Sequence, residues 1–295
     1  MTLEIIPMDP GRSAFAAQVK GVDPSRPISD EDVRAIEKGM DRYGVLVFRG
    51  QPLTEAQHLE FSIRFGELEA PFDVPGQASQ KERLAAAFND ISNLDRNNQV
   101  MAQNDRRRLY QLGNMLWHSD SSYKSTPAKY SLLYARAIPD HGGATQFADM
   151  RDAWDTLDEA TKKLALPLIG EHSRLFSRAE LGFEFDDQER LKYAPVRQRL
   201  VRRHPSTRRL SLYLSSHCGN IVGFPLPEAR ALLRELTEHA TQRERVYSHS
   251  WRTDDLVMWD NRVTMHRGTR YPSDQVRDMR RTTLIDSAPT LEQPV

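Results

Sequence analysis

Apolar residues near the start of the chain recur at helical spacing in one segment and form an unbroken run in the next. Val33, Ile36 and Met40 lie three or four residues apart, so one face of a helix would carry all three. Ser29 precedes them and is followed by three acidic residues, a pattern typical of a helix N-terminus. Residues 44–48 are a short apolar run after this helix, and they predict a buried strand.

A second helix is predicted from a capping pair. Thr54 is followed three residues later by Gln57, and such residues can satisfy each other's backbone N–H groups at a helix start. We expect this helix to run to about Phe65 and to end at Gly66, because glycine is the commonest residue just past a helix.

Short β-patterned segments alternate with helical ones in the rest of the chain. Strands are predicted at residues 130–135, 145–148, 210–214 and 255–259, and helices at 151–165 and 227–240. Many short strands with helices in front and inserted between them favour an α+β, mainly β protein with a β-sandwich or jelly-roll core. No shift in composition divides the chain, so residues 1–295 are predicted to form a single domain.

Residues 70–115 show neither pattern clearly. They contain several proline, asparagine and glutamine residues and the basic run 106–108, and only residues 90–93 look like a strand. Long irregular segments in a compact domain are usually functional or disordered. We therefore interpret this region as loops. One reading of these loops is a lid over an active site, and the other is a disordered segment.

Composition and charge exclude several functional classes. Lys+Arg and Asp+Glu both number 41, so the net charge is zero and nothing calls for nucleic acid or a membrane surface. No apolar run approaches the roughly 18 residues of a membrane helix. The N-terminus lacks the pattern of a secretion signal, so a cytoplasmic location is expected. The single cysteine, Cys218, excludes an intramolecular disulfide and a thiolate metal cluster.

The triplet 118–120 is the first candidate for chemistry. His118 and Asp120 are two residues apart, so on a strand their side chains would point to the same face. With one distant histidine, for which His266 is the candidate, they would complete the two-histidine, one-carboxylate set that binds iron(II). Read in isolation, the triplet also suits a surface loop, and His266 suits a hydrogen-bonded histidine at a strand end.

Two arginines follow His266 at offsets that strengthen this interpretation. Arg277 and Arg281 are four residues apart, so an extended strand would direct both side chains to one face. The planar guanidinium group binds both oxygens of a carboxylate. A strand that returns beside the metal would therefore bring two anion-binding groups to the same pocket.

These motifs, in this order, resemble the TauD/TfdA family of iron(II)- and 2-oxoglutarate-dependent dioxygenases. The similarity runs from residues 44–51 to Arg281, across nearly the whole chain. Its motifs are the stretches 117–120, 142–145 and 259–268, followed by the two arginines Arg277 and Arg281. Within the family, residues 116–122 and 147–151 resemble the branch that cleaves 2,4-dichlorophenoxyacetate and other phenoxyalkanoates.

The resemblance implies a double-stranded β-helix (jelly-roll) fold with flanking and inserted helices and a metal at one mouth. It implies that His118, Asp120 and His266 are the iron ligands. It further implies that Thr145 and Arg277 bind the distal carboxylate of 2-oxoglutarate, whose other end takes two of the three remaining iron positions. Dioxygen is the third reactant.

The same resemblance assigns the pocket of the main substrate. Arg281 would face the substrate's anionic group or the second carboxylate of the cosubstrate, and Asn114 and His217 would reach into the pocket. His204 is a weaker candidate, and a loop histidine beside a proline is an equally good reading. Residues 71–75 depart from the branch, because they contain no lysine where its members carry lysines.

The implied reaction is hydroxylation of a small organic anion. For an aryloxyalkanoate, hydroxylation beside the ether oxygen gives an unstable hemiacetal, which breaks down to a phenol and glyoxylate while 2-oxoglutarate becomes succinate and CO2. The alternative within the family is an alkylsulfonate such as taurine, or a sulfate ester. Family members are commonly dimers or tetramers, so a homo-oligomer is expected by resemblance.

Two other classes compete with this reading. Zinc also accepts two histidines and a carboxylate, so a zinc hydrolase could use the same three ligands, but that reading leaves Thr145, Arg277 and Arg281 unexplained. A non-catalytic binding module on a jelly-roll scaffold is the other class. It would be favoured by loss of a ligand, and none of the three is missing.

Overall fold

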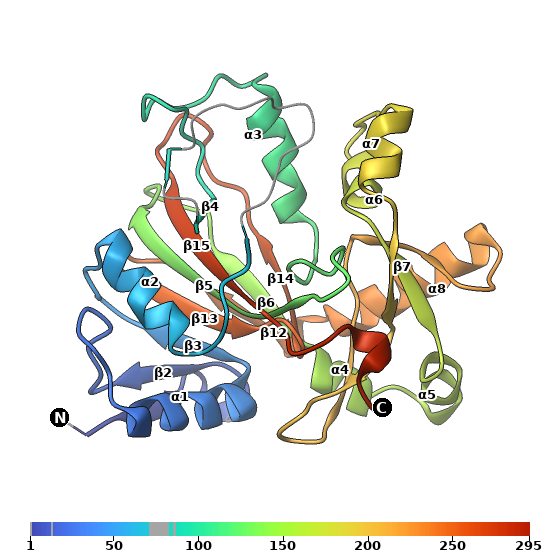
Figure 1. Ribbon diagram of the computed structural model, residues 1–295, viewed down its shortest axis with the longest axis horizontal. Helices are drawn as coiled ribbons and strands as arrows, with labels where there is room; N and C mark the ends of the chain where they lie inside the picture. The colour runs from blue at the N-terminus through green and yellow to red at the C-terminus, as the bar shows by residue number, and fades with distance from the viewer. Residues whose placement is uncertain (1, 13, 71–82, 85–86) are drawn as a thin grey trace.

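The largest unit of the fold is a seven-stranded sheet, which crosses the centre of the computed structural model (Figure 1). The structure describes residues 2–12, 14–70, 83–84 and 87–295. All neighbouring strands pair antiparallel except β2 and β3, which run parallel. In spatial order the strands are β1 (Glu4–Pro7), β2 (Ala17–Lys20), β3 (Val45–Phe48), β13 (Leu256–Asp260), β5 (Ala128–Ala137), β15 (Asp278–Ile285) and β4 (Asn89–Asp90).

A three-stranded sheet packs against one face of this large sheet. It consists of β12 (Val246–His249), β6 (Thr145–Asp149) and β14 (Thr264–Gly268), with β6 in the middle. Both sheets contribute to one buried apolar cluster, in which Phe147 of β6 lies with Leu133 of β5 and Trp259 of β13. This packing fixes β6 and β14 beside the centre of the large sheet.

Most of the segment from residue 150 to residue 245 forms a lobe beside the two sheets, on the right of Figure 1. Its core is a separate apolar cluster in which Leu233 and Leu236 of a long helix pack on Leu212 and Ile221. The strands of the lobe are β7 (Ile169–His172), β8 (Val196–Arg199), β9 (Val201–Arg203), β10 (Leu210–Leu212) and β11 (Cys218–Ile221). Its α-helices are α4 (Met150–Asp155), α5 (Glu159–Ala165), α6 (Arg174–Ala179), α7 (Asp187–Lys192) and α8 (Leu226–Ala240).

Two helices near the N-terminus confirm the capping patterns in the sequence. Helix α1 (Asp30–Tyr43) begins after Ser29, whose side chain accepts a hydrogen bond from the backbone N–H of residue 32. Helix α2 (Glu55–Ile63) begins with the reciprocal capping box of Thr54 and Gln57 and ends slightly earlier than expected. The other helices of the described residues are α3 (Arg106–Gln111) and the 3-10 helices η1 (Pro10–Arg12), η2 (Leu112–Met115), η3 (Arg243–Arg245) and η4 (Thr290–Glu292).

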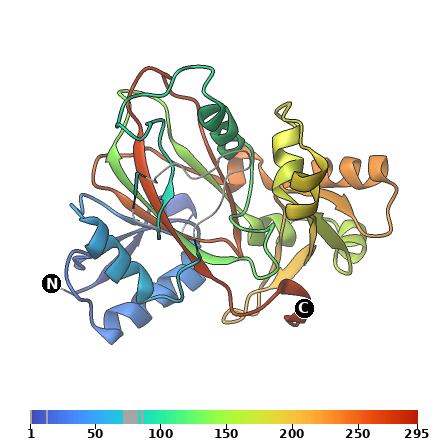
Figure 2. The same ribbon diagram turned by 45° about the horizontal axis from the view of Figure 1, so that its top comes forward.

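The structure confirms the predicted mixture of helices and sheets and most of the predicted strands. Residues 151–165 are largely helical as predicted, but they form two helices, because Thr156 ends α4 and Asp158 caps a separate helix, α5. The interpretation of 70–115 as loops is also incomplete, because β4, α3 and η2 lie within it (Figure 2). The lysine-free stretch 71–75 lies outside the described residues.

Among the described residues, no helix has both the length and the apolar character needed to cross a bilayer.

Buried His172 makes the fold sensitive to acid. Neither ring nitrogen has a hydrogen-bond partner among the described residues, and burial lowers the pKa of His172 to about 3. Below pH 6.5 the unfolded chain binds a proton at His172, whereas the folded chain does not. The contribution of His172 to the free energy of unfolding is therefore fully present above pH 6.5 and is lost as the pH drops towards 3. The expected slope from this residue is about 1.4 kcal/mol per pH unit.

Urea unfolding of His172→Leu at several pH values tests this prediction. The variant should lose less stability than the wild-type protein between pH 6 and pH 4, because leucine has no proton to bind. An identical slope in the two proteins would show that His172 contributes nothing to the acid sensitivity.

Candidate metal centre

The backbone brings residues 118–120 to the edge of the small sheet. His118 and His266 of β14 exchange two backbone hydrogen bonds of 3.0 and 2.8 Å, which form an isolated antiparallel bridge. The expectation that 118–120 is a strand is wrong, because the chain turns at Asp120 directly after this bridge. The hydroxyl of Ser119 holds the turn by donating to the backbone oxygen of Thr264, at 3.1 Å. The turn, rather than strand periodicity, directs the two side chains together.

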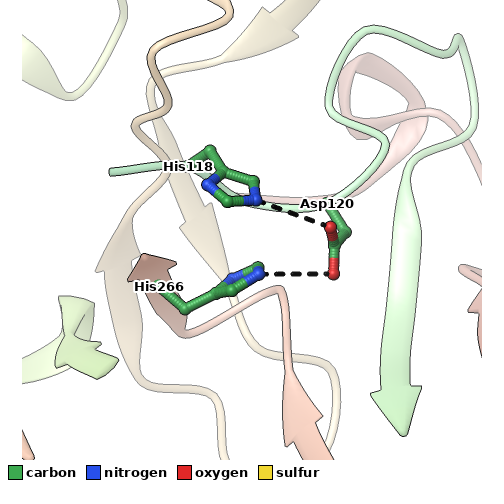
Figure 3. Close-up of side chains that lie close together, drawn as sticks. All are labelled: His118, Asp120 and His266. Carbon is green, nitrogen blue, oxygen red and sulfur yellow. Dashed lines mark ion pairs between the residues drawn. The ribbon is translucent and has the colours of Figure 1, made fainter. Parts of the chain in front are cut away.

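The three predicted ligands converge in one buried cluster (Figure 3). Nε2 of His118 lies 3.8 Å from Oδ1 of Asp120, and Nε2 of His266 lies 3.7 Å from Oδ2 of the same carboxylate. These separations are too long for hydrogen bonds. One ligand atom from each residue lies within 4.8 Å of the others, so a single cation between them could contact all three. Two imidazoles and a carboxylate suit iron(II), and zinc also accepts them.

The protonation of the cluster suits a cation. Nδ1 of His118 lies 2.8 Å from the backbone oxygen of Leu116, an acceptor, so this nitrogen carries the proton and Nε2 offers a lone pair. Burial lowers the pKa of both histidines, and for His266 the neighbouring His118 lowers it further. Burial raises the pKa of Asp120, but Arg281 and the two histidines outweigh burial and bring it below its usual value. The site therefore offers two neutral imidazoles and one carboxylate at neutral pH.

A cavity opens beside the cluster. The stretch that we interpreted as a possible lid supplies part of its wall, including Ile91 and Leu112. The predicted site residues along this cavity are Asn114, His118, Thr145, His266, Arg277 and Arg281.

Arg277 is a buried cation that faces this cavity. It is 7% exposed, and its guanidinium group contacts the backbone oxygen of Ile91, at 3.3 Å, and the ring of Tyr271. Among the described residues, no carboxylate forms an ion pair with it. Burial lowers the pKa of Arg277, as expected where no anion compensates its charge. An anionic ligand would supply the missing charge.

Thr145 lies at the start of β6 and offers a hydroxyl donor to the same cavity. The indole N–H of Trp251 donates a hydrogen bond of 3.0 Å to its Oγ1. Since an indole N–H can only donate, the hydroxyl hydrogen of Thr145 stays available to an acceptor in the cavity.

Arg281 lies closer to the metal cluster than the sequence indicated. Its Nη1 donates a short hydrogen bond to Oδ1 of Asp120, and the side chain is almost buried. The position of this guanidinium on the cavity wall still allows contact with an anionic ligand. Its role as a substrate anchor therefore stays a prediction.

Two candidate histidines are not among the described residues that line the cavity. His217 lies behind the metal cluster, where its ring centroid is 5.9 Å from that of His118 and its Nδ1 is 3.0 Å from Oγ of Ser177. His204 is buried elsewhere, with Nε2 at 3.2 Å from Oδ2 of Asp260. That contact favours the structural reading of His204.

Sequence reasoning overlooked three side chains that touch the site. The hydroxyl of Ser131 donates to the carboxylate of Asp120, and Oδ1 of Asn261 accepts from the backbone N–H of Asp120. The indole N–H of Trp251 donates to the hydroxyl of Thr145. Asn261 lies within the family motif 259–268, but the motif does not indicate its partners. No local pattern identifies Ser131 or Trp251, because their partners lie far away in the sequence.

Comparison with known proteins agrees with the geometry. The family model described as "Taurine catabolism dioxygenase TauD, TfdA family" matches residues 4–283. A relative from Cupriavidus pinatubonensis (strain JMP 134 / LMG 1197), named alpha-ketoglutarate-dependent 2,4-dichlorophenoxyacetate dioxygenase, is 41% identical over 95% of this chain and 98% of its own length. A relative from Sphingobium herbicidovorans, named (S)-phenoxypropionate/alpha-ketoglutarate-dioxygenase, is 36% identical over 94% of this chain and 92% of its own length.

A solved structure shares the fold over almost the full length. It is described as AAD-2 in complex with Mn(II) and N-oxalylglycine, and its sequence is 47% identical to this one. The two superpose with a TM-score of 0.90, over 99% of this chain and 100% of the other.

Proposed function

This chain belongs to the taurine catabolism dioxygenase TauD, TfdA family, and we propose that it oxidises an aryloxyalkanoate with iron(II), 2-oxoglutarate and dioxygen. The observation that carries the proposal is the convergence of three features in one cavity. These are the metal cluster, the hydroxyl donor of Thr145 and the buried cation Arg277, which has no carboxylate partner among the described residues. The two sheets and their shared core support a double-stranded β-helix fold, and the match over residues 4–283 supports a single domain.

His118, Asp120 and His266 would hold the metal. Their donor atoms fit a divalent cation, and both imidazoles are neutral and can offer a lone pair. Iron(II) bound there would supply the redox chemistry that uses 2-oxoglutarate and dioxygen. The residues around it bind, orient and shield the two organic reactants.

Thr145 and Arg277 would bind the distal carboxylate of 2-oxoglutarate. The guanidinium group supplies the charge and the threonine hydroxyl donates a hydrogen bond. Both groups lie on the wall of the cavity that contains His118 and His266, so a short dicarboxylate could reach the metal and both anchors together.

Arg281, Asn114 and His217 would recognise the main substrate. Arg281 and Asn114 lie on the cavity wall, and Arg281 would bind the substrate carboxylate. His217 would act from behind His118. One oxygen atom of O2 enters the carbon beside the ether oxygen and the other enters succinate, with loss of CO2. The hemiacetal then breaks its C–O bond to give a phenol and glyoxylate.

The competing readings have less support. A zinc hydrolase or a binding module would leave the unpaired Arg277 without a role. An alkylsulfonate or sulfate-ester substrate remains chemically compatible with Arg281, but relatives named for 2,4-dichlorophenoxyacetate and (S)-phenoxypropionate share 41% and 36% identity with this chain. We further propose a cytoplasmic homo-oligomer with no nucleic-acid or membrane partner, on the basis of the neutral charge and the family resemblance.

Oxygen uptake by the iron(II)- and 2-oxoglutarate-loaded protein tests the substrate class. We expect 2,4-dichlorophenoxyacetate to stimulate uptake and release a phenol, whereas taurine and a linear alkyl sulfate should stimulate it much less. Stronger stimulation by either sulfur compound would move the substrate to that class and leave the cofactors unchanged.

Replacing Trp251 with Phe should weaken binding of 2-oxoglutarate. The variant loses the N–H that orients the hydroxyl of Thr145, a hydrogen bond worth about 0.5 to 1.5 kcal/mol, so KM for 2-oxoglutarate should rise about 2- to 10-fold. The turnover number should change little. Trp154→Phe is the control, because Trp154 packs in the separate core of the lobe. Equal KM values in both variants and the wild-type protein would exclude this role for Trp251.

A further inference from the structure

The carboxylate of Asp120 is held by a chain of hydrogen bonds that reaches it from two other parts of the fold. We propose that Ser131 and Asn261 are positioning residues, which fix the rotation of the Asp120 carboxylate and so set the affinity of the site for its metal. The inference rests on the proposed metal site, and it adds two residues that touch neither the metal ligands' donor nitrogens nor the cavity.

The direction of each hydrogen bond follows from Asn261. Its Oδ1 receives the indole N–H of Trp259, at 3.0 Å, and the backbone N–H of Asp120, at 3.1 Å. Because both partners can only donate, this atom is the amide oxygen and the other atom is the NH2 group. Nδ2 of Asn261 then donates to Oγ of Ser131, at 3.0 Å.

The hydrogen bond from Asn261 determines that the hydroxyl of Ser131 donates to the metal ligand Asp120. Its oxygen already accepts from Asn261, so its single hydroxyl hydrogen is free for the carboxylate. Oγ of Ser131 lies 2.7 Å from Oδ2 of Asp120, a distance typical of a strong bond from a hydroxyl to a charged acceptor. Asn261 therefore commits Ser131 to act as a donor to Asp120.

The chain is rigid because every member is buried. Ser131 and Asn261 are 0% exposed and Asp120 is 3% exposed, so water does not compete for these bonds. Ser131 is fixed in β5, which pairs with both β13 and β15 in the large sheet. Asn261 follows β13 directly, and its backbone N–H donates to the backbone oxygen of Lys129, at 2.9 Å.

The Asp120 carboxylate also has a second partner, Arg281, besides the hydroxyl of Ser131. Arg281 contacts Oδ1, while Ser131 holds Oδ2 from another side. With both in place, the two oxygens stay 3.8 and 3.7 Å from the imidazole Nε2 atoms of His118 and His266. Without the hydroxyl of Ser131, the carboxylate could rotate towards the guanidinium and away from the histidines. Metal affinity should then fall, as when partners that orient metal ligands are removed elsewhere.

The test compares Mn(II) binding by Ser131→Ala and by a matched control. Thr283 pairs directly with Ser131 across β5 and β15, is 1% exposed, and its hydroxyl has no hydrogen-bond partner among the described residues. The dissociation constant of Mn(II), measured from the paramagnetic resonance signal of the free ion, should rise about 10- to 100-fold in Ser131→Ala. It should not change in Thr283→Val. Ser131→Thr keeps a hydroxyl and should recover most of the affinity.

Melting temperatures separate positioning from a merely structural role. Ser131→Ala is expected to melt earlier without metal, because it loses two hydrogen bonds, whereas Thr283→Val loses none. Only Ser131→Ala should also lose part of the rise in melting temperature that Mn(II) causes. Wild-type affinity in folded Ser131→Ala would overturn the inference while leaving the proposed metal site intact. A wild-type protein that fails to bind Mn(II) would instead contradict the metal site itself.

Discussion

Asp120→Ala should abolish metal binding and turnover of 2-oxoglutarate. The substitution removes the only carboxylate among the three converging ligands and leaves the guanidinium of Arg281 beside two imidazoles without its anion. Removing one partner of a buried charged pair also costs about 3 to 5 kcal/mol of folding stability, so the variant should melt at a lower temperature as well. Titration with Mn(II) and measurement of succinate production test the two parts of this prediction.

Asp278→Ala provides the control for general loss of a buried carboxylate. Asp278 is 7% exposed and pairs with Arg83 at 2.7 Å, but it is not one of the three clustered ligands. This variant should lose stability and keep Mn(II) binding. Continued turnover of 2-oxoglutarate in Asp120→Ala would show that the three-ligand assignment is wrong.

Arg277→Gln should selectively weaken the binding of 2-oxoglutarate. Glutamine keeps a hydrogen-bond donor, but it lacks the positive charge that Arg277 presents to a carboxylate in the cavity. Hydrogen bonds to charged groups contribute about 1.5 to 3 kcal/mol, so KM for 2-oxoglutarate should rise about 10- to 150-fold. The KM of the main substrate should change much less.

Arg280→Gln is the matched control, because it removes a neighbouring arginine of similar burial. Arg280 is 9% exposed and pairs with Glu55 of α2, and it does not line the cavity. Its substitution should lower stability and leave KM for 2-oxoglutarate unchanged. An unchanged KM in Arg277→Gln would exclude the assigned role, and an equal rise in both variants would indicate a general disturbance of β15.

The parts of the fold with strong local signals could be predicted from the sequence. Ser29 and Thr54 cap α1 and α2 as expected, because a cap needs only residues within one turn of the helix. The break between α4 and α5 was missed for a related reason. The cap of Asp158 on α5 lies inside a segment with continuous helical spacing, and the spacing concealed it.

The sequence indicated which residues form the metal site, but it indicated few of the contacts between them. His118, Asp120 and His266 could be identified because the family motif contains them, although the strand used to bring the first two together is a turn. The contact of Arg281 with Asp120 joins residues 161 positions apart, and that between Ser131 and Asn261 joins residues 130 apart. Such contacts depend on how β5, β13 and β15 pair, which no local pattern determines.

The products formed from 2,4-dichlorophenoxyacetate give the most direct test of the central claim. The protein would be incubated with this substrate, iron(II), 2-oxoglutarate and air, and the organic acids would be quantified. The account predicts equal amounts of 2,4-dichlorophenol, glyoxylate and succinate, with none formed when iron(II) or 2-oxoglutarate is omitted. Release of the phenol with glycolate and without succinate would mean hydrolysis of the ether, and it would contradict an oxidative reaction at this site.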